Sequence, residues 1–177
     1  MASSEEFLEH FIYFHKRLRP PSKWEWIVLH HSKTKDGKTV SWGAIRRFHT
    51  KVRGWASIGY HFGIELLRDQ YEILLGRSLL MDGAHCKEKG LNRNGIGICL
   101  VGDFDIAPPP EEQLELALKL CEWLCVEFEI PPSRVIGHRE AAPWKTCPGL
   151  KFPLEEFRTR LAERLDERLD LRGGRKA

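Results

Sequence analysis

Histidine and cysteine side chains stand at the ends of short apolar runs in this sequence. His30 and His31 follow the run at 26–29, and His138 follows a second run, nine positions before Cys147. Two imidazoles and one thiolate suit Zn²⁺, and three protein ligands leave a fourth position open. One histidine of the pair, His138 and Cys147 therefore make a candidate zinc site. The net charge there would be about +1 and would lower the pKa of a bound water toward ~7.

Cysteine chemistry is an alternative that the residues alone leave open. Cys147 could act as a nucleophile with His138 as its partner, and no compact helical motif of the His-x-x-x-His type favours zinc over this reading. Cys121 and Cys125 could form a redox or metal pair, but they lie on the apolar stripe of an expected helix, where small hydrophobic residues are common. Cys86, in a polar segment, is the thiol that we expect to be most exposed.

The elements that must hold these residues alternate between strands and helices. Apolar runs predict strands at 26–29 (ending at the histidine pair), 60–67, 70–75, 96–101 and 135–136. Apolar residues at steps of three and four predict helices at 3–18, 41–52, 111–128 and from residue 153 onward. In α/β proteins, sites usually lie at strand ends and in the loops that follow them. The pattern therefore predicts an α/β fold whose strand ends carry the chemistry.

Composition fits one globular domain and excludes several classes of protein. The chain has 177 residues, of which 42% are apolar and 30% charged. A net charge of +3 excludes a histone-like polycation, and five cysteines are too few for a disulfide scaffold. Residues 1–60 hold 11 Lys and Arg against 5 Asp and Glu, so this part could attract an anionic polymer. No zinc-finger spacing or RNA-binding aromatic signature accompanies it, and we expect no nucleic-acid partner.

The beginning of the chain does not resemble a secretory signal, because acidic residues come first and histidines break the apolar runs. No stretch approaches the ~20 apolar residues of a transmembrane helix. We therefore expect synthesis in the cytoplasm without a signal peptide and no transmembrane segment. Any work outside the cell would need a separate export or lysis route.

Four segments in order carry a family resemblance: IVLHHS, GWASIGYHFGIE, NGIGICLVGDFD and VIGHREAAPWKTCPG. Together they resemble the zinc-dependent N-acetylmuramoyl-L-alanine amidases of the amidase-2 and peptidoglycan-recognition family, over roughly residues 24–153. The resemblance implies a mixed central β-sheet flanked by helices, with a zinc cleft at one side of the sheet. We expect an N-terminal helical extension at 1–23, the amidase domain at 24–153, and a C-terminal helix with a disordered basic tail at 154–177.

The resemblance also implies ligands and catalytic residues. One Zn²⁺ would be bound by His30, the first residue of the pair, with His138 and Cys147. Tyr60 and Lys145 match the family's catalytic positions. The implied reaction is hydrolysis of the amide between N-acetylmuramic acid and L-alanine by a zinc-activated water. In our hypothesis Lys145 stabilises the oxyanion, and Tyr60 hydrogen-bonds the water or carries a proton.

Substrate contacts and subtype follow from the same resemblance. His85 lies in a segment similar to the family's substrate-groove loop, and we expect it to contact substrate together with His31 and Asn94. Cys99 stands where muropeptide-recycling relatives carry a glutamate, and recognition proteins without activity typically lose the cysteine ligand that Cys147 retains. The expected protein is a monomeric phage or prophage endolysin that acts on peptidoglycan or muropeptides. The alternatives are a cytoplasmic muropeptide-recycling amidase and a non-catalytic peptidoglycan-binding receptor.

Overall fold

The computed structural model describes residues 24–34 and 41–173. The predicted extension at 1–23 and the predicted tail after residue 173 lie outside the described residues. The predicted domain limits at residues 23 and 153 stay predictions.

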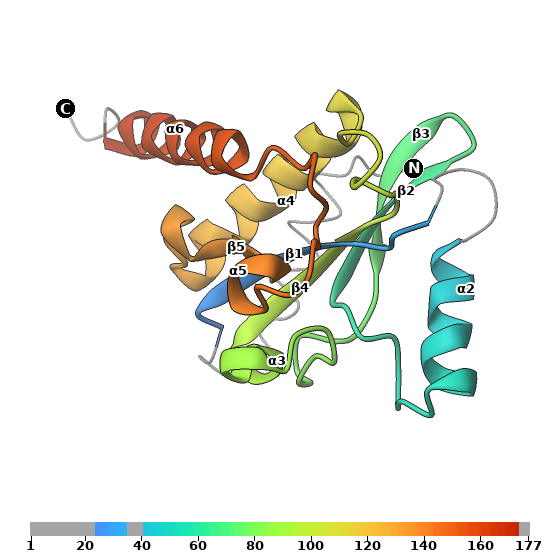
Figure 1. The fold of residues 1–177 in the computed structure, drawn as a ribbon. Coiled ribbons are helices and arrows are strands. Elements are labelled where there is room, and N and C mark those ends of the chain that lie inside the picture. The colour runs from blue at the N-terminus through green and yellow to red at the C-terminus, as the bar shows by residue number, and fades with distance from the viewer. Residues whose placement is uncertain (1–23, 35–40, 174–177) are drawn as a thin grey trace.

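A five-stranded mixed sheet forms the centre of the molecule (Figure 1). In spatial order its strands are β3 Gln70–Leu75, β2 Phe62–Leu67, β4 Gly95–Leu100, β1 Trp26–His31 and β5 Val135–Gly137. β1 runs parallel to β4 and β5, β2 runs parallel to β4, and β2 and β3 form an antiparallel hairpin. The α/β class and the mixed sheet are confirmed, and each predicted strand is present, with its ends within two residues of the prediction.

Side chains alternate across β1, and this alternation separates the two histidines at its end. Ile27 and Leu29 point into the main core, which α4 and α6 cover. Val28 packs on the other face, and His30 shares its side because it lies two residues further along the strand. His31 therefore points to the side of the main core. Strand geometry therefore sends the two side chains to opposite faces of the sheet, and both border the cleft, which lies at the end of the strand.

Helices cover both faces of the sheet. They are α2 Trp42–Arg47, α3 Leu91–Asn94, α4 Glu111–Phe128, α5 His138–Ala141 and α6 Leu154–Gly173. A π-helical turn at Phe48–Val52 extends α2, and 3-10 turns occupy Glu88–Gly90 and Pro132–Arg134. α4 packs on β2, β3 and α6, and Figure 1 shows α4 and α6 side by side, well apart from α2. Trp42 of α2 packs on the opposite face, in a second cluster with Cys99 and Val101.

The two long helices share one core with the sheet. Phe157 and Leu161 of α6 are fully buried in that core. Cys121 and Cys125 of α4 are buried there too, and burial raises the pKa of Cys125 to about 12 and that of Cys121 well above its usual value. Such thiols stay protonated and behave as small apolar residues, which argues against a redox pair. Across the described ranges, no helix is long and apolar enough to cross a membrane.

Candidate metal centre

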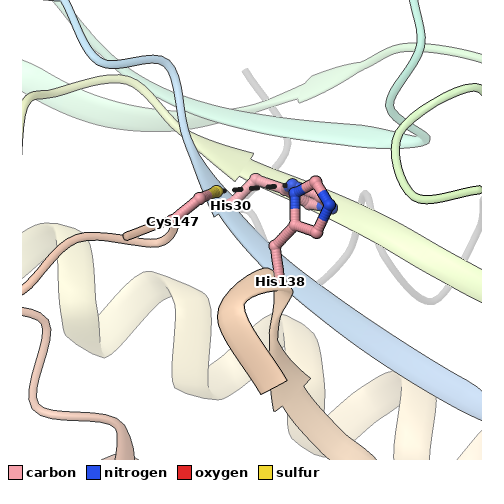
Figure 2. A group of neighbouring side chains, drawn as sticks. All are labelled: His30, His138 and Cys147. Atoms are coloured by element: carbon pink, nitrogen blue, oxygen red, sulfur yellow. Dashed lines mark hydrogen bonds between the residues drawn. The ribbon is translucent and has the colours of Figure 1, made fainter. Parts of the chain in front are cut away.

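The predicted ligands come together where β1 and β5 end (Figure 2). His30 is the next-to-last residue of β1, His138 begins α5 directly after β5, and Cys147 lies in the loop after α5. Because β1 and β5 are parallel neighbours, their carboxyl ends lie at the same edge of the sheet. One ligand atom of each residue lies within 4.8 Å of the other two. Both histidines are buried and Cys147 is half-buried.

The spacing of these atoms fits a zinc ion. His30 Nδ1 lies 3.5 Å from Cys147 Sγ. A Zn–N bond of about 2.0–2.1 Å and a Zn–S bond of about 2.3 Å at a tetrahedral angle would separate the two atoms by ~3.6 Å. Three protein ligands leave the fourth tetrahedral position to water or substrate, which is the arrangement of catalytic zinc sites.

Hydrogen bonds determine which nitrogen of His30 faces the other ligands. His85 Nε2 lies 3.0 Å from the carbonyl oxygen of Gly95, which only accepts, so this nitrogen carries the proton of a neutral His85. His85 Nδ1 therefore accepts the Nε2–H of His30 at 3.0 Å. This arrangement leaves the lone pair of His30 Nδ1 directed toward Cys147. Gly97 permits the contact, since a Cβ there would lie 2.5 Å from the His85 ring.

Burial keeps the ligand side chains uncharged. It lowers the pKa of His30 well below its usual value, with further lowering from the neighbouring His85 and His138. It also lowers the pKa of His138 and brings that of His85 to about 3. The thiol of Cys147 has its pKa raised by burial to about 12. Neutral imidazoles are the metal-binding form. A thiol with this pKa is a poor nucleophile at neutral pH, and a bound cation is the group that would remove its proton. The site therefore favours metal binding over the cysteine-nucleophile alternative.

The loop that carries Cys147 is fastened on both sides by Asp105. Its carboxylate accepts hydrogen bonds from Thr146 Oγ1 and from the backbone N–H of Leu150, both at 2.9 Å. Lys33 Nζ lies 3.1 Å from the same carboxylate. Partial burial acts to raise the pKa of Asp105, but the hydrogen bonds outweigh it and lower the pKa to about 2. The charged carboxylate therefore holds the loop of Cys147 in place, a role that was not predicted from the sequence.

A cleft of about 540 Å³ contains the three ligands together with the predicted catalytic residues Tyr60 and Lys145. Trp55 and Trp144 also line it, and Trp144 is 72% exposed. An apolar hollow of about 400 Å³ between α4 and α6 contains none of the predicted site residues. The cleft at the strand ends is therefore the candidate site.

Tyr60 and Lys145 enter the cleft from different elements. Tyr60 lies just before β2, with its ring centroid 5.2 Å from that of His30 and stacked on Trp42 at 6.2 Å. Burial raises the pKa of Tyr60 well above 10, so its hydroxyl stays protonated and can donate a hydrogen bond. Lys145 is exposed in the turn after α5. Burial is the main cause that lowers the pKa of His138, and the positive charge of Lys145 is the second. The ammonium group of Lys145 therefore lies near the candidate ligands.

The segment that leads to Tyr60 is held by Arg77. The guanidinium donates to the backbone carbonyls of Ile58 at 3.0 Å, Ser57 at 3.2 Å and Asp82 at 2.7 Å. The backbone N–H of Arg77 donates to the carbonyl of Tyr60 at 2.8 Å. Arg77 could not be predicted from the sequence, because backbone carbonyl partners leave no signature in a sequence.

The three residues predicted to contact substrate lie in different surroundings. His85 lines the cleft, but both of its ring nitrogens are engaged in the hydrogen bonds described above. His31 also lines the cleft, and its Nδ1 accepts from the backbone N–H of Phe104 at 3.2 Å. Asn94 precedes β4 at the end remote from His30 and does not line the cleft. Substrate contact by these three residues stays a prediction.

Cys86 is buried, and the prediction that it is the most exposed thiol is wrong. Its side chain and backbone are only 2% exposed. The polar segment folds back on itself, so that Asn92 Oδ1 accepts from the backbone N–H groups of His85 and Cys86 at 2.7 and 2.8 Å. Apolar residues of β1, β5 and α5 then cover the thiol. These residues are distant in sequence, so the local polarity gave no sign of the burial.

Comparisons with known proteins agree with this geometry. Residues 20–150 match the family described as N-acetylmuramoyl-L-alanine amidase. The chain is 34% identical over 137 residues to an endolysin of Enterobacteria phage T3, covering 75% of this chain and 85% of the phage protein. It is 32% identical over 132 residues to peptidoglycan-recognition protein LB of Drosophila melanogaster, covering 70% and 54% of the two chains. The solved structure of the amidase LysC from Clostridium intestinale URNW superposes with a TM-score of 0.67 at 28% identity, covering 78% of this chain and 85% of that one. The chain belongs to the N-acetylmuramoyl-L-alanine amidase family.

Proposed function

We propose that this protein is a zinc-dependent amidase that hydrolyses the bond between N-acetylmuramic acid and L-alanine of peptidoglycan, and that it serves as a phage or prophage endolysin. The observation that carries the proposal is the meeting of His30, His138 and Cys147 in a cleft that also holds Tyr60 and Lys145. Membership of the amidase family and the similarity to a phage endolysin support it.

Each residue of the cleft has a chemical task in this proposal. Zn²⁺, when bound, would lower the pKa of a water and polarise the scissile carbonyl. His30 and His138 present neutral nitrogens, and the loop fastened by Asp105 presents the thiolate. Tyr60 keeps its proton, so it donates a hydrogen bond to the reacting oxygen and is a proton source for the leaving amine. Lys145 places a positive charge near the ligands, where it stabilises the oxyanion that develops on the carbonyl.

Two features favour an endolysin over the alternatives. The complete ligand set supports an enzyme over a receptor without activity. Cys99 pairs with His30 across the sheet and is fully buried. It provides a thiol where the family resemblance assigns a catalytic carboxylate to muropeptide-recycling amidases.

The test measures zinc content, loss of turbidity of purified cell walls, and cleavage of soluble muropeptide by the purified chain. We expect about one zinc per chain, and wall lysis that EDTA stops and added zinc restores. Tyr60→Phe and Lys145→Ala should keep zinc but lose ~10²-fold or more in turnover. Glu112→Gln, on the exposed side of α4, is the matched surface control.

Each other outcome points to a different function. Wild-type rates in both active-site variants would remove Tyr60 and Lys145 from the mechanism. Cleavage of soluble muropeptide without wall lysis would indicate a recycling amidase, and binding without cleavage a receptor. Cleavage that resists EDTA but is blocked by a thiol alkylator would indicate a cysteine hydrolase.

A further inference from the structure

One nitrogen of His138 is buried without a hydrogen bond. His138 is 4% exposed, and its Nε2 has no hydrogen-bond partner within the described part of the chain. The carboxylate of Glu88 lies close by, with its Oε2 3.6 Å from this nitrogen, and the two side chains are only 5% and 13% exposed. This separation is too long for an ordinary hydrogen bond but well within ion-pair reach. A buried imidazole nitrogen normally has a hydrogen-bond partner, and Glu88 is placed where it could act as that partner.

His30 offers a direct comparison in the same cluster. Its Nε2–H is taken by His85, which leaves its Nδ1 for the ligand side. The two nitrogens of an imidazole lie on different edges of the ring. If Nε2 of His138 is turned to Glu88, Nδ1 is the nitrogen left for the side of His30 and Cys147. Metal-bound histidines usually donate their second N–H to a carboxylate, a carbonyl or a water.

We propose that Glu88 is a positioning residue that holds His138 as a metal ligand by accepting the proton on its Nε2. The inference rests on the proposed zinc function. The carboxylate keeps Nδ1 free of a proton, fixes the plane of the ring and makes the ligand nitrogen more basic. In this proposal, a small shift of the His138 ring on metal binding brings its Nε2 from 3.6 Å into hydrogen-bond distance of Glu88 Oε2.

The surrounding loop is built to hold this carboxylate. Cys86 Sγ donates to Glu88 Oε2 at 3.5 Å. Lys89 and Gly90 have φ angles of 51° and 73°, and this left-handed turn reverses the chain directly after Glu88. Lys89 Nζ donates to the carbonyl of Glu140 at 3.4 Å, which ties the loop to α5, the helix that begins with His138.

A second cation held by Cys86, Glu88 and His138 is the competing explanation, since ligand atoms of these three also lie within 4.8 Å of one another. Two observations argue against it. The group shares His138 with the first cluster. Its thiol is only 2% exposed among apolar side chains and does not line the cleft, whereas Cys147 does.

The test measures zinc affinity of metal-free protein by competition with a chromophoric chelator, and the visible spectrum after loading with Co²⁺. Glu88→Gln keeps the shape but loses the charge, and Glu88→Ala removes the acceptor. We expect zinc affinity to fall ~10-fold in the first and up to ~100-fold in the second, with an altered Co²⁺ spectrum in both. Glu72→Gln, on the exposed side of β3, is the control and should match wild type. Because Glu88→Gln is nearly isosteric, it keeps the test valid even if Glu88→Ala fails to fold.

Zinc affinity and a Co²⁺ spectrum unchanged in Glu88→Gln would overturn the inference. Two zinc ions in wild type and one in Glu88→Gln would overturn it in favour of a second cation site. A wild-type chain that binds no zinc would overturn the proposed function itself. Failure of the inference alone is thus distinguishable, because wild type would then bind one zinc and Glu88→Gln would bind it equally well.

Discussion

The two proposed histidine ligands differ in the charge of the group that lies beside their second ring nitrogen. His30 donates to His85, a neutral imidazole whose other nitrogen is fixed by the carbonyl of Gly95. His138 stands beside the carboxylate of Glu88. Zn²⁺ with the thiolate of Cys147 carries about +1, so one neutral and one anionic partner bring the buried assembly close to zero net charge. A nearly neutral assembly is the one that a buried site tolerates at least cost.

At the residue scale, we predict that His85→Ala weakens zinc binding ~10–100-fold. The change leaves the Nε2–H of His30 unpaired in a buried site and lets the ring take the other tautomer, in which Nδ1 is protonated. His85→Gln, which keeps an acceptor oxygen, should recover part of the affinity. Chelator competition measures both variants.

His49→Ala is the matched control for this prediction. His49 is another buried histidine of the cleft, but its Nδ1 accepts from the backbone N–H of Gly59 and not from a ligand residue. We expect it to bind zinc as wild type does. Equal affinity in His85→Ala and wild type would show that the hydrogen bond to His30 does not position the ligand.

At the scale of elements, the ligand loop depends on one acidic side chain from another segment. Asp105 follows β4 by five residues, yet it holds Thr146 and Leu150 on either side of Cys147. The loop has no regular structure of its own to hold Cys147 in place. Its position is therefore set by the clamp that Asp105 provides together with Arg139, whose backbone N–H donates to the carbonyl of Cys147 at 2.7 Å.

We predict that Asp105→Asn lowers both zinc affinity and the free energy of unfolding at pH 7. The pKa of Asp105 is about 2 in the folded chain, below its ordinary value of 3.8, so the charged form favours folding. This contribution is complete above pH 4 and is lost as pH falls from 3.8 toward 2. Urea midpoints at pH 7, 5 and 3 should therefore show a difference between wild type and variant that shrinks only at the lowest pH. A difference that stays constant across these values would rule out the charged clamp, and Glu72→Gln serves as the control.

Helices that repeat the apolar pattern over several turns could be predicted from the sequence, and helices of a single turn could not. The apolar stripe predicts a helix at 111–128, and α4 spans Glu111–Phe128. α3 and α5 have four residues each, too few for a period to appear. Residue type and spacing were enough to find His138 and Cys147. Glu88 was missed because its partner lies fifty residues further along the chain, where only the fold brings the two together.

At the scale of the whole molecule, the proposed metal centre would join three distant parts of the chain. The ligands come from β1, from the first residue of α5 and from the loop after it, so they span residues 30 to 147. A bound cation holds these parts together only in the folded chain. Without a cation the ligands are neutral and buried, as their shifted pKa values indicate. Most of the free energy of zinc binding should therefore appear as folding stability.

We predict that zinc raises the unfolding temperature of the metal-free chain, with ~2.7 kcal/mol of added stability when free zinc is 100-fold above its Kd. Because zinc must displace the thiol proton of Cys147, whose pKa burial raises to about 12, this increment at a fixed zinc concentration should be smaller at pH 5.5 than at pH 7.5. Cys147→Ser should lose most of the increment yet unfold near the wild-type temperature in EDTA, since the thiol it replaces is uncharged there. Mg²⁺ prefers oxygen ligands and should have no effect. Thermal unfolding followed by circular dichroism measures each case, and equal unfolding temperatures with and without zinc would contradict a metal centre that links the three segments.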